Sequence, residues 1–185
     1  DRFTPAAKPK HVLVVGGGVA GMEAARVAAE RGHRVTLAGA SDKLGGQFRL
    51  AGLTPRRHQI IDFLDWQERE LTRLQVQLRL NSPMDAADVA AIGADAVIVA
   101  TGSWPDGNGF QRAMPECDVL PGVEKGQVVS AEDVMARRAV PGKRVLILDE
   151  TGNWKGGGVA LYLAEAGHEL VIVTGQANIM AEMTR

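Results

Sequence analysis

The chain has 185 residues, 45% of them hydrophobic and 23% charged, which suits a globular protein of one domain, or one domain and part of another. A net charge of −1 and the lack of a long apolar run indicate no nucleic-acid partner and no membrane partner, and we expect a cytoplasmic protein. The single cysteine, Cys117, excludes an internal disulfide framework and a cysteine-based metal or iron–sulfur site made by this chain alone. The four histidines show no ligand spacing, so we expect no metal site.

The leading motif of the chain follows a polar segment, residues 1–10, whose two prolines indicate a linker. Residues 11–38 read HVLVVGGGVAGMEAARVAAERGHRVTLA. A short apolar run over 11–15 stops at a glycine-rich turn, a helical pattern ends at Gly32, and a second apolar run covers 34–38. This order predicts a βαβ unit of the type that binds dinucleotides.

The glycines of the turn each have a separate physical role. Gly16 lets the chain turn sharply off the strand, Gly18 lets the backbone approach phosphate oxygens, and Gly21 lets the helix pack tightly. The helix N-terminus then offers free N–H groups and a partial positive charge to an anion. The alternative is a tight turn without a ligand. The predicted pyrophosphate site comprises Gly16, Gly17, Gly18, Val19, Ala20 and Gly21.

The second strand of such a unit usually ends in an acid that accepts a hydrogen bond from the adenosine ribose. The strand register places Gly39 there, followed by Ala40, and Asp42 lies beyond the strand as a weak substitute. Losing the acid removes roughly 1.5–3 kcal/mol of charge-assisted hydrogen bonding, and also the repulsion that excludes a 2′-phosphate. We therefore expect a cofactor-lining position at Gly39 and Ala40, with weaker adenine-nucleotide binding or binding through backbone contacts.

The segment 39–53 is rich in glycine and small residues and contains KLGGQF. Two adjacent glycines after a lysine suit a backbone that lies against a cofactor with a positive charge nearby, although an ordinary turn has the same composition. The predicted cofactor-lining residues here are Lys43, Gly45, Gly46 and Gln47.

The middle of the chain alternates helices and strands. Apolar spacing predicts a helix over 57–74, a strand near 76–80 and a short helix over 85–92. The continuous apolar run 94–100 predicts a buried parallel strand. It ends at Ala100, Thr101 and Gly102, at the sheet edge where open α/β proteins bind ligands, so these three residues are further candidates.

The opening pattern then recurs. After an irregular segment over 103–128 and a helix over 131–138, a strand (144–148), a helix (158–166) and a strand (170–174) form a second βαβ unit. The predicted fold is an α/β, Rossmann-like parallel sheet. We expect a FAD- or ADP-binding domain over 11–140, and over 141–185 the start of a second nucleotide-binding unit.

The turn of the second unit differs chemically from the first. Asp149 stands in the place of Gly16, with Glu150 beside it, while Gly156 takes the place of Gly21. Each carboxylate opposes a pyrophosphate by about 1 kcal/mol, and Trp154 is bulky, whereas Lys155 and the glycines favour an anion. A degenerate site is the favoured interpretation, and ordinary NAD(P)H binding is the alternative.

These motifs occur in an order that resembles the C-terminal nucleotide-binding region of a family of two-part flavoenzymes. The fingerprint, LGGQF, ADAVIVATG and the second βαβ unit carry the resemblance over about residues 8–175. The family includes 2,4-dienoyl-CoA reductase, trimethylamine dehydrogenase and histamine dehydrogenase. The resemblance implies an N-terminal barrel of the old yellow enzyme type that carries FMN and an iron–sulfur cluster. It also implies a nucleotide-binding part that holds FAD and NADPH, or only ADP.

The resemblance implies that the fingerprint glycines hold the pyrophosphate, that Lys43 to Gln47 line the cofactor, and that Ala100 to Gly102 close over it. Gly39 and the acidic second turn resemble the amine dehydrogenases, whereas LGGQF resembles the reductases, so FAD and ADP both remain open. The implied function is a nucleotide-binding fragment of a multidomain flavin-dependent oxidoreductase, with the barrel as partner and no catalytic residue of its own. The alternative is a nucleotide-free module that docks against a partner.

Overall fold

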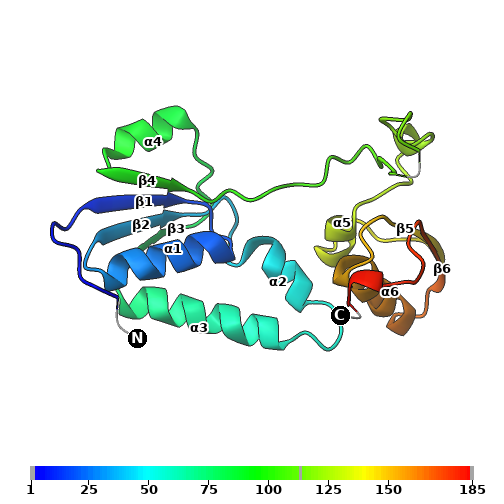
Figure 1. Cartoon of the computed structure of the whole chain (residues 1–185), viewed down its shortest axis with the longest axis horizontal. Helices are drawn as coiled ribbons and strands as arrows, with labels where there is room; N and C mark the ends of the chain where they lie inside the picture. The colour runs from blue at the N-terminus through cyan, green and yellow to red at the C-terminus, as the bar shows by residue number, and fades with distance from the viewer. Residues whose placement is uncertain (1–2, 113, 184–185) are drawn as a thin grey trace. The chain divides into compact units, whose positions relative to one another are not determined.

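The computed structural model describes residues 3–112 and 114–183 and divides the chain into two compact units (Figure 1). The first unit runs to Arg49 and resumes at Gln59–Ser103; the second comprises Leu50–His58 and the chain from Trp104 onward. The ends of the predicted linker and of the predicted second domain, residues 1–2 and 184–185, lie outside the described residues. The domain boundaries 11–140 and 141–185 stay a prediction.

The first unit is built on a four-stranded parallel sheet with the order β3-β2-β1-β4. Its strands are β1 (His11–Val15), β2 (Arg34–Ala38), β3 (Gln77–Arg79) and β4 (Ala96–Val99). The chain winds outward from β1 through β2 to β3, and then returns to place β4 on the other side of β1. This reversal makes the carboxyl end of β1 a topological switch point, where open α/β sheets bind ligands. The Rossmann-like fold class is confirmed.

Helices cover both faces of this sheet, as Figure 1 shows. One face carries α1 (Val19–Glu30) and α3 (Gln59–Arg73), and the other carries α4 (Ala86–Ile92). On the α4 side, the fully buried Leu13 packs with Val89 and Ile92 of the helix. Asp85 caps α4 through the amides of Ala87 and Asp88, which explains why the helix starts where the sequence predicted.

Two features of this part of the chain differ from the sequence predictions. A seven-residue helix, α2 (Gly46–Gly52), lies in the glycine-rich segment 39–53, for which no helix was predicted, because glycines flank a stretch of good helix formers. The run predicted as a buried strand, β4, has exposed side chains, with Val99 at 72% exposure. In the described part of the chain β4 is an edge strand with a neighbour on one side only, so its side chains have fewer neighbours to cover them than those of β1.

The second unit contains the predicted second βαβ motif. Strands β5 (Arg144–Asp149) and β6 (Glu169–Thr174) pair in parallel and are joined by α6 (Trp154–Glu165). Helix α6 starts four residues earlier than predicted because Asn153 caps it by accepting a hydrogen bond from the Lys155 amide at 2.9 Å. Its other described elements are α5 (Ala131–Met135) and the 3-10 turns η1 (Val123–Lys125) and η2 (Ala181–Met183).

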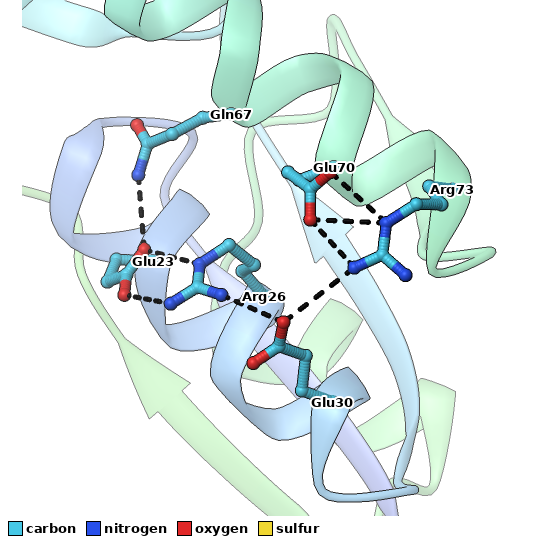
Figure 2. Close-up of polar contacts among 6 residues, drawn as sticks. All are labelled: Glu23, Arg26, Glu30, Gln67, Glu70 and Arg73. Carbon is cyan, nitrogen blue, oxygen red and sulfur yellow. Dashed lines mark hydrogen bonds and ion pairs between the residues drawn. The ribbon is translucent and has the colours of Figure 1, made fainter. Parts of the chain in front are cut away.

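A network of charged side chains ties α1 to α3 (Figure 2). The Arg26 guanidinium donates to both carboxylate oxygens of Glu23, at 2.8 and 2.7 Å, and pairs with Glu30 at 3.1 Å. Glu30 lies 3.7 Å from Arg73 on α3, which also pairs with Glu70. Arg26 further lies between the Phe3 and Trp66 rings, 5.8 and 5.7 Å from their centroids, so the start of the described chain also packs against α1.

The hydrogen bonds from Arg26 lower the pKa of the Glu23 carboxyl, although partial burial opposes them. A carboxyl with a lowered folded-state pKa contributes stability above its unfolded pKa, and that contribution is lost as the pH falls through the folded value.

We expect Arg26→Met to reduce this acid-dependent loss of stability, because Glu23 then titrates near its ordinary pKa in both states. Urea unfolding at about pH 7 and about pH 3 measures the difference. Arg69→Met is the matched control, since Arg69 is an exposed arginine of α3. An unchanged pH dependence in Arg26→Met would contradict the assignment.

Candidate dinucleotide-binding site

The predicted site residues gather at the carboxyl edge of the first sheet. Gly16, directly after β1, donates its N–H to the Ala38 carbonyl at the end of β2, at 2.8 Å. On the other side, the Ala100 N–H donates to the Val15 carbonyl at 2.7 Å. Three predicted segments, the fingerprint, Gly39–Ala40 and Ala100–Gly102, therefore meet at one edge, because parallel strands end on the same side.

Two fingerprint glycines are required by the fold itself. Gly16 has φ 121°, and a Cβ added there would lie 2.1 Å from the Ala100 carbonyl oxygen. A Cβ added at Gly21 would lie 1.9 Å from the Gly16 carbonyl oxygen. Both distances are far inside van der Waals contact. These two glycines therefore let α1 and β4 approach the turn, whether or not a ligand is present.

Gly18 has a different reason to be a glycine. It is the N-cap residue of α1, with φ −77°, a conformation open to any residue, and a Cβ added there would meet nothing within 4 Å. Among the described residues no side chain caps this helix, and its first turn contains no acid. The positive end of α1 is therefore neither capped by a side chain nor screened by an acid of the first turn, and the space beside the Gly18 Cα is open, which fits an anionic pyrophosphate.

The LGG segment packs directly against the fingerprint. Gly45 donates its N–H to the Gly17 carbonyl at 2.7 Å and forms a parallel bridge with Gly18. A Cβ added at Gly46 would lie 3.2 Å from the Gly18 Cα. The glycines thus let two backbone segments lie side by side at the start of α1, which an isolated turn would not require.

The flanking polar residues extend this surface. Lys43 is exposed at the start of the segment. The Gln47 side-chain amide donates to the carbonyl oxygen of Ser103, just after Thr101 and Gly102, and so links the LGG segment to the loop after β4. The structure therefore brings the predicted residues of the LGG segment close to those of the loop after β4.

Arg49, which was not among the predicted site residues, holds the LGG segment in place. Its guanidinium donates to the Leu44 carbonyl at 2.5 Å and pairs with Glu68 of α3 at 2.6 Å. An arginine in a short amphipathic segment gives no sequence signal for this role, because its partner lies on another helix.

Gly39 directly follows β2, at the place where the second strand of such a unit usually ends in the ribose acid. Gly39 is buried, donates to the Arg79 carbonyl at 2.8 Å, and accepts from the Ser82 N–H at 2.9 Å. A Cβ added at Gly39 would lie 3.6 Å from the Gly17 Cα, an ordinary contact. A Cβ at this position therefore meets no steric clash. Ala40 and Asp42 are both exposed.

In the second unit, charges near the turn are largely paired. The Lys155 ammonium lies 2.6 Å from the buried Glu132 carboxylate, so the cation expected to favour an anion already has a partner. Glu150 accepts a hydrogen bond from the Arg112 N–H at 3.0 Å, and the Arg57 guanidinium stacks on Trp154. Over the described residues, no group of three or more histidine, cysteine, aspartate or glutamate side chains is arranged to hold a metal ion.

Comparison with known proteins agrees with this geometry. Residues 11–88 match the family described as FAD dependent oxidoreductase. Over these residues, which contain the fingerprint and the LGG segment, the chain is similar to FAD-dependent oxidoreductases. It is 46% identical over 173 residues to N,N-dimethylglycine/sarcosine dehydrogenase of Chromohalobacter salexigens, a match that covers 93% of this chain and 24% of that protein.

Solved structures show the same relationship. A 2-naphthoyl-CoA reductase is 30% identical with a TM-score of 0.85, covering 97% of this chain and 25% of that one. Histamine dehydrogenase from Rhizobium sp. 4-9 is 29% identical with a TM-score of 0.83, covering 97% and 28%. The resemblance to flavin-dependent amine dehydrogenases and CoA-ester reductases is confirmed. The chain spans about a quarter of the length of these relatives. No helix among the described residues is long and apolar enough to cross a membrane.

The contrast between the fingerprint glycines predicts different effects of one methyl group. We expect Gly16→Ala to lower the free energy of unfolding by several kcal/mol, because its methyl group collides with the Ala100 carbonyl. Gly18→Ala should change it by less than about 1 kcal/mol, because its methyl group meets nothing and the N-cap preference for glycine over alanine is modest. Chemical denaturation of both variants measures this, and equal losses would contradict the distinction.

Proposed function

We propose that the first turn of this FAD-dependent oxidoreductase domain binds the pyrophosphate of FAD or of ADP. The observation that carries the proposal is the uncapped N-terminus of α1 at Gly18, where the backbone faces open space between two glycine segments. The match to FAD-dependent oxidoreductases over residues 11–88 supports it independently, because that range contains both segments. When FAD is bound, its flavin ring supplies redox chemistry; the residues of this chain bind and orient the nucleotide.

In this proposal each predicted group has a separate task. Gly16 to Gly21 direct N–H groups of the turn and of α1 at the phosphates. The exposed Lys43 adds a positive charge beside them, while Gly45, Gly46 and Gln47 line the next part of the cofactor. Ala100, Thr101 and Gly102 close over it from the end of β4. The Gln47–Ser103 hydrogen bond supports this arrangement because it holds the two loops together.

The proposal extends to the longer protein. Because the chain spans about a quarter of its relatives, we propose that it is the nucleotide-binding part of a multidomain flavin-dependent oxidoreductase. Its partner within the same polypeptide would be a barrel of the old yellow enzyme type carrying FMN and an iron–sulfur cluster, and the whole protein would be cytoplasmic. Substrate chemistry would belong to that partner, since no residue of this chain is assigned a catalytic role.

A nucleotide-free docking module is the second candidate. The observation that favours it is the glycine at position 39, which leaves the ribose without its usual acidic acceptor.

A binding experiment separates these two functions. The chain is reconstituted with FAD and its visible spectrum recorded, and ADP is titrated by calorimetry. We expect retained flavin or ADP binding, weakened about tenfold or more in Gly18→Ala, because the methyl group displaces a phosphate from charge-assisted hydrogen bonds. Gly142→Ala is the matched control, since its methyl group also meets nothing. If the chain retains no flavin and does not bind ADP at millimolar concentration, the docking module remains as the function.

Restoring the ribose acid should increase adenine-nucleotide affinity. We expect Gly39→Asp to tighten ADP binding about tenfold, because a Cβ at this position makes only ordinary contacts and the new carboxylate accepts from the ribose hydroxyls. The same variant should weaken binding of the 2′-phosphorylated nucleotide through charge repulsion. Calorimetry with both ligands measures the change, and Gly142→Asp controls for added charge. Equal weakening of both ligands would show that Gly39 does not face the ribose.

A further inference from the structure

The glycine turns of the two βαβ units have a similar backbone arrangement, but different groups occupy the space between the end of the strand and the start of the helix. In α1 the third residue is Gly21, whose missing side chain faces the Gly16 carbonyl. In α6 the third residue is Gly156, and a Cβ added there would lie 2.6–2.8 Å from the Asp149 carboxylate atoms. Asp149 is the last residue of β5. A carboxylate therefore occupies the space between strand end and helix start.

This carboxylate uses the backbone donors of its own loop. Asp149 is 4% exposed, and its Oδ1 accepts from the Thr151 N–H at 3.1 Å, the Thr151 hydroxyl at 3.0 Å and the Gly152 N–H at 3.1 Å. Its Oδ2 is buried, has no hydrogen-bond partner among the residues that the structure describes, and lies against the first turn of α6, next to Gly156. The positive end of that helix stabilises a carboxylate in this position.

The N-terminus of α6 is also closed, unlike that of α1. Asn153 caps it through the Lys155 N–H at 2.9 Å, whereas Gly18 at the same place in α1 has no side chain to do so. The N–H groups of Thr151, Gly152 and Lys155 are therefore engaged by side chains of the same loop.

We infer that Asp149 is a built-in anion, which takes the place of a dinucleotide pyrophosphate in the second βαβ unit and excludes NAD(P)H from it. The carboxylate fills the space, uses the donors and adds a negative charge that repels phosphate. Glycine at position 156 is kept because it makes room for this side chain. The inference concerns the second turn alone and does not depend on nucleotide binding at the first.

Amide-resolved NMR of the ¹⁵N-labelled chain tests it, with NADPH as the probe. In the native sequence we expect the amides of Thr151, Gly152 and Lys155 to be unmoved by millimolar NADPH. Shifts in residues 16–21 report separately on the first turn. A response of the second-turn amides in the native chain would overturn the inference.

The decisive variant is Asp149→Gly, which copies the first turn. We expect its second-turn amides to respond to NADPH with at least about tenfold tighter binding than in the native chain, because the variant frees the space beside Gly156 and the Thr151 and Gly152 N–H groups and removes the negative charge. Glu150→Gln is the control, since it removes a neighbouring charge and leaves Asp149 in place; an equal gain there would reduce the effect to net charge and overturn the inference. A folded Asp149→Gly variant with no gain in NADPH affinity would also overturn the inference. If that variant does not fold, Asp149→Ala also removes the carboxylate from the space beside Gly156, and failure of this second variant to gain affinity decides against the inference.

Discussion

The close approach of α1 to the end of β1 is the constraint on which the first unit depends. A carbonyl oxygen at Gly16 lies where the Cβ of residue 21 would be, and the Ala100 carbonyl lies where the Cβ of residue 16 would be. Because these contacts involve backbone, which cannot move aside as a side chain can, only glycine satisfies them. They fix the helix N-terminus at the switch point of the sheet and bring β4 alongside, so the geometry of the proposed site follows from packing that no ligand is needed to explain.

This packing separates the glycines that the fold requires from one that the fold does not require. Gly16 and Gly21 would be glycines in any tight βαβ unit, and they carry little information about a ligand. Gly18 has ordinary backbone angles and open surroundings, so the fold alone accepts another residue there. The second unit also separates these two roles. It keeps the tight helix approach at Gly156 and fills the anion position with a side chain of its own.

The sequence predicted the elements whose signals are local. Strands β1 and β2, helix α1 and the capped start of α4 lie where apolar periodicity, glycines and the Asp85 cap placed them. The gathering of the three candidate segments at one edge also followed from parallel strand order. In contrast, α2 was missed because its glycines imitate a loop, and α6 was started late because three glycines within its first turns mask the Asn153 cap. Long-range contacts such as Arg49 to Glu68 leave no local pattern.

Burial was the property that local sequence predicted least well, and the reason is physical. Continuous apolar runs belong to strands covered on both faces, which is why β4 was expected to be buried. The same composition occurs in β5 and β6, where Val145, Ile147 and Leu170 pack on the helices while Leu146 and Val171 are about 60% exposed. Apolar side chains on the uncovered edge and face are suited to burial by further protein. Their exposure agrees with a chain that spans about a quarter of its relatives, because in a longer protein these surfaces have neighbours to pack against.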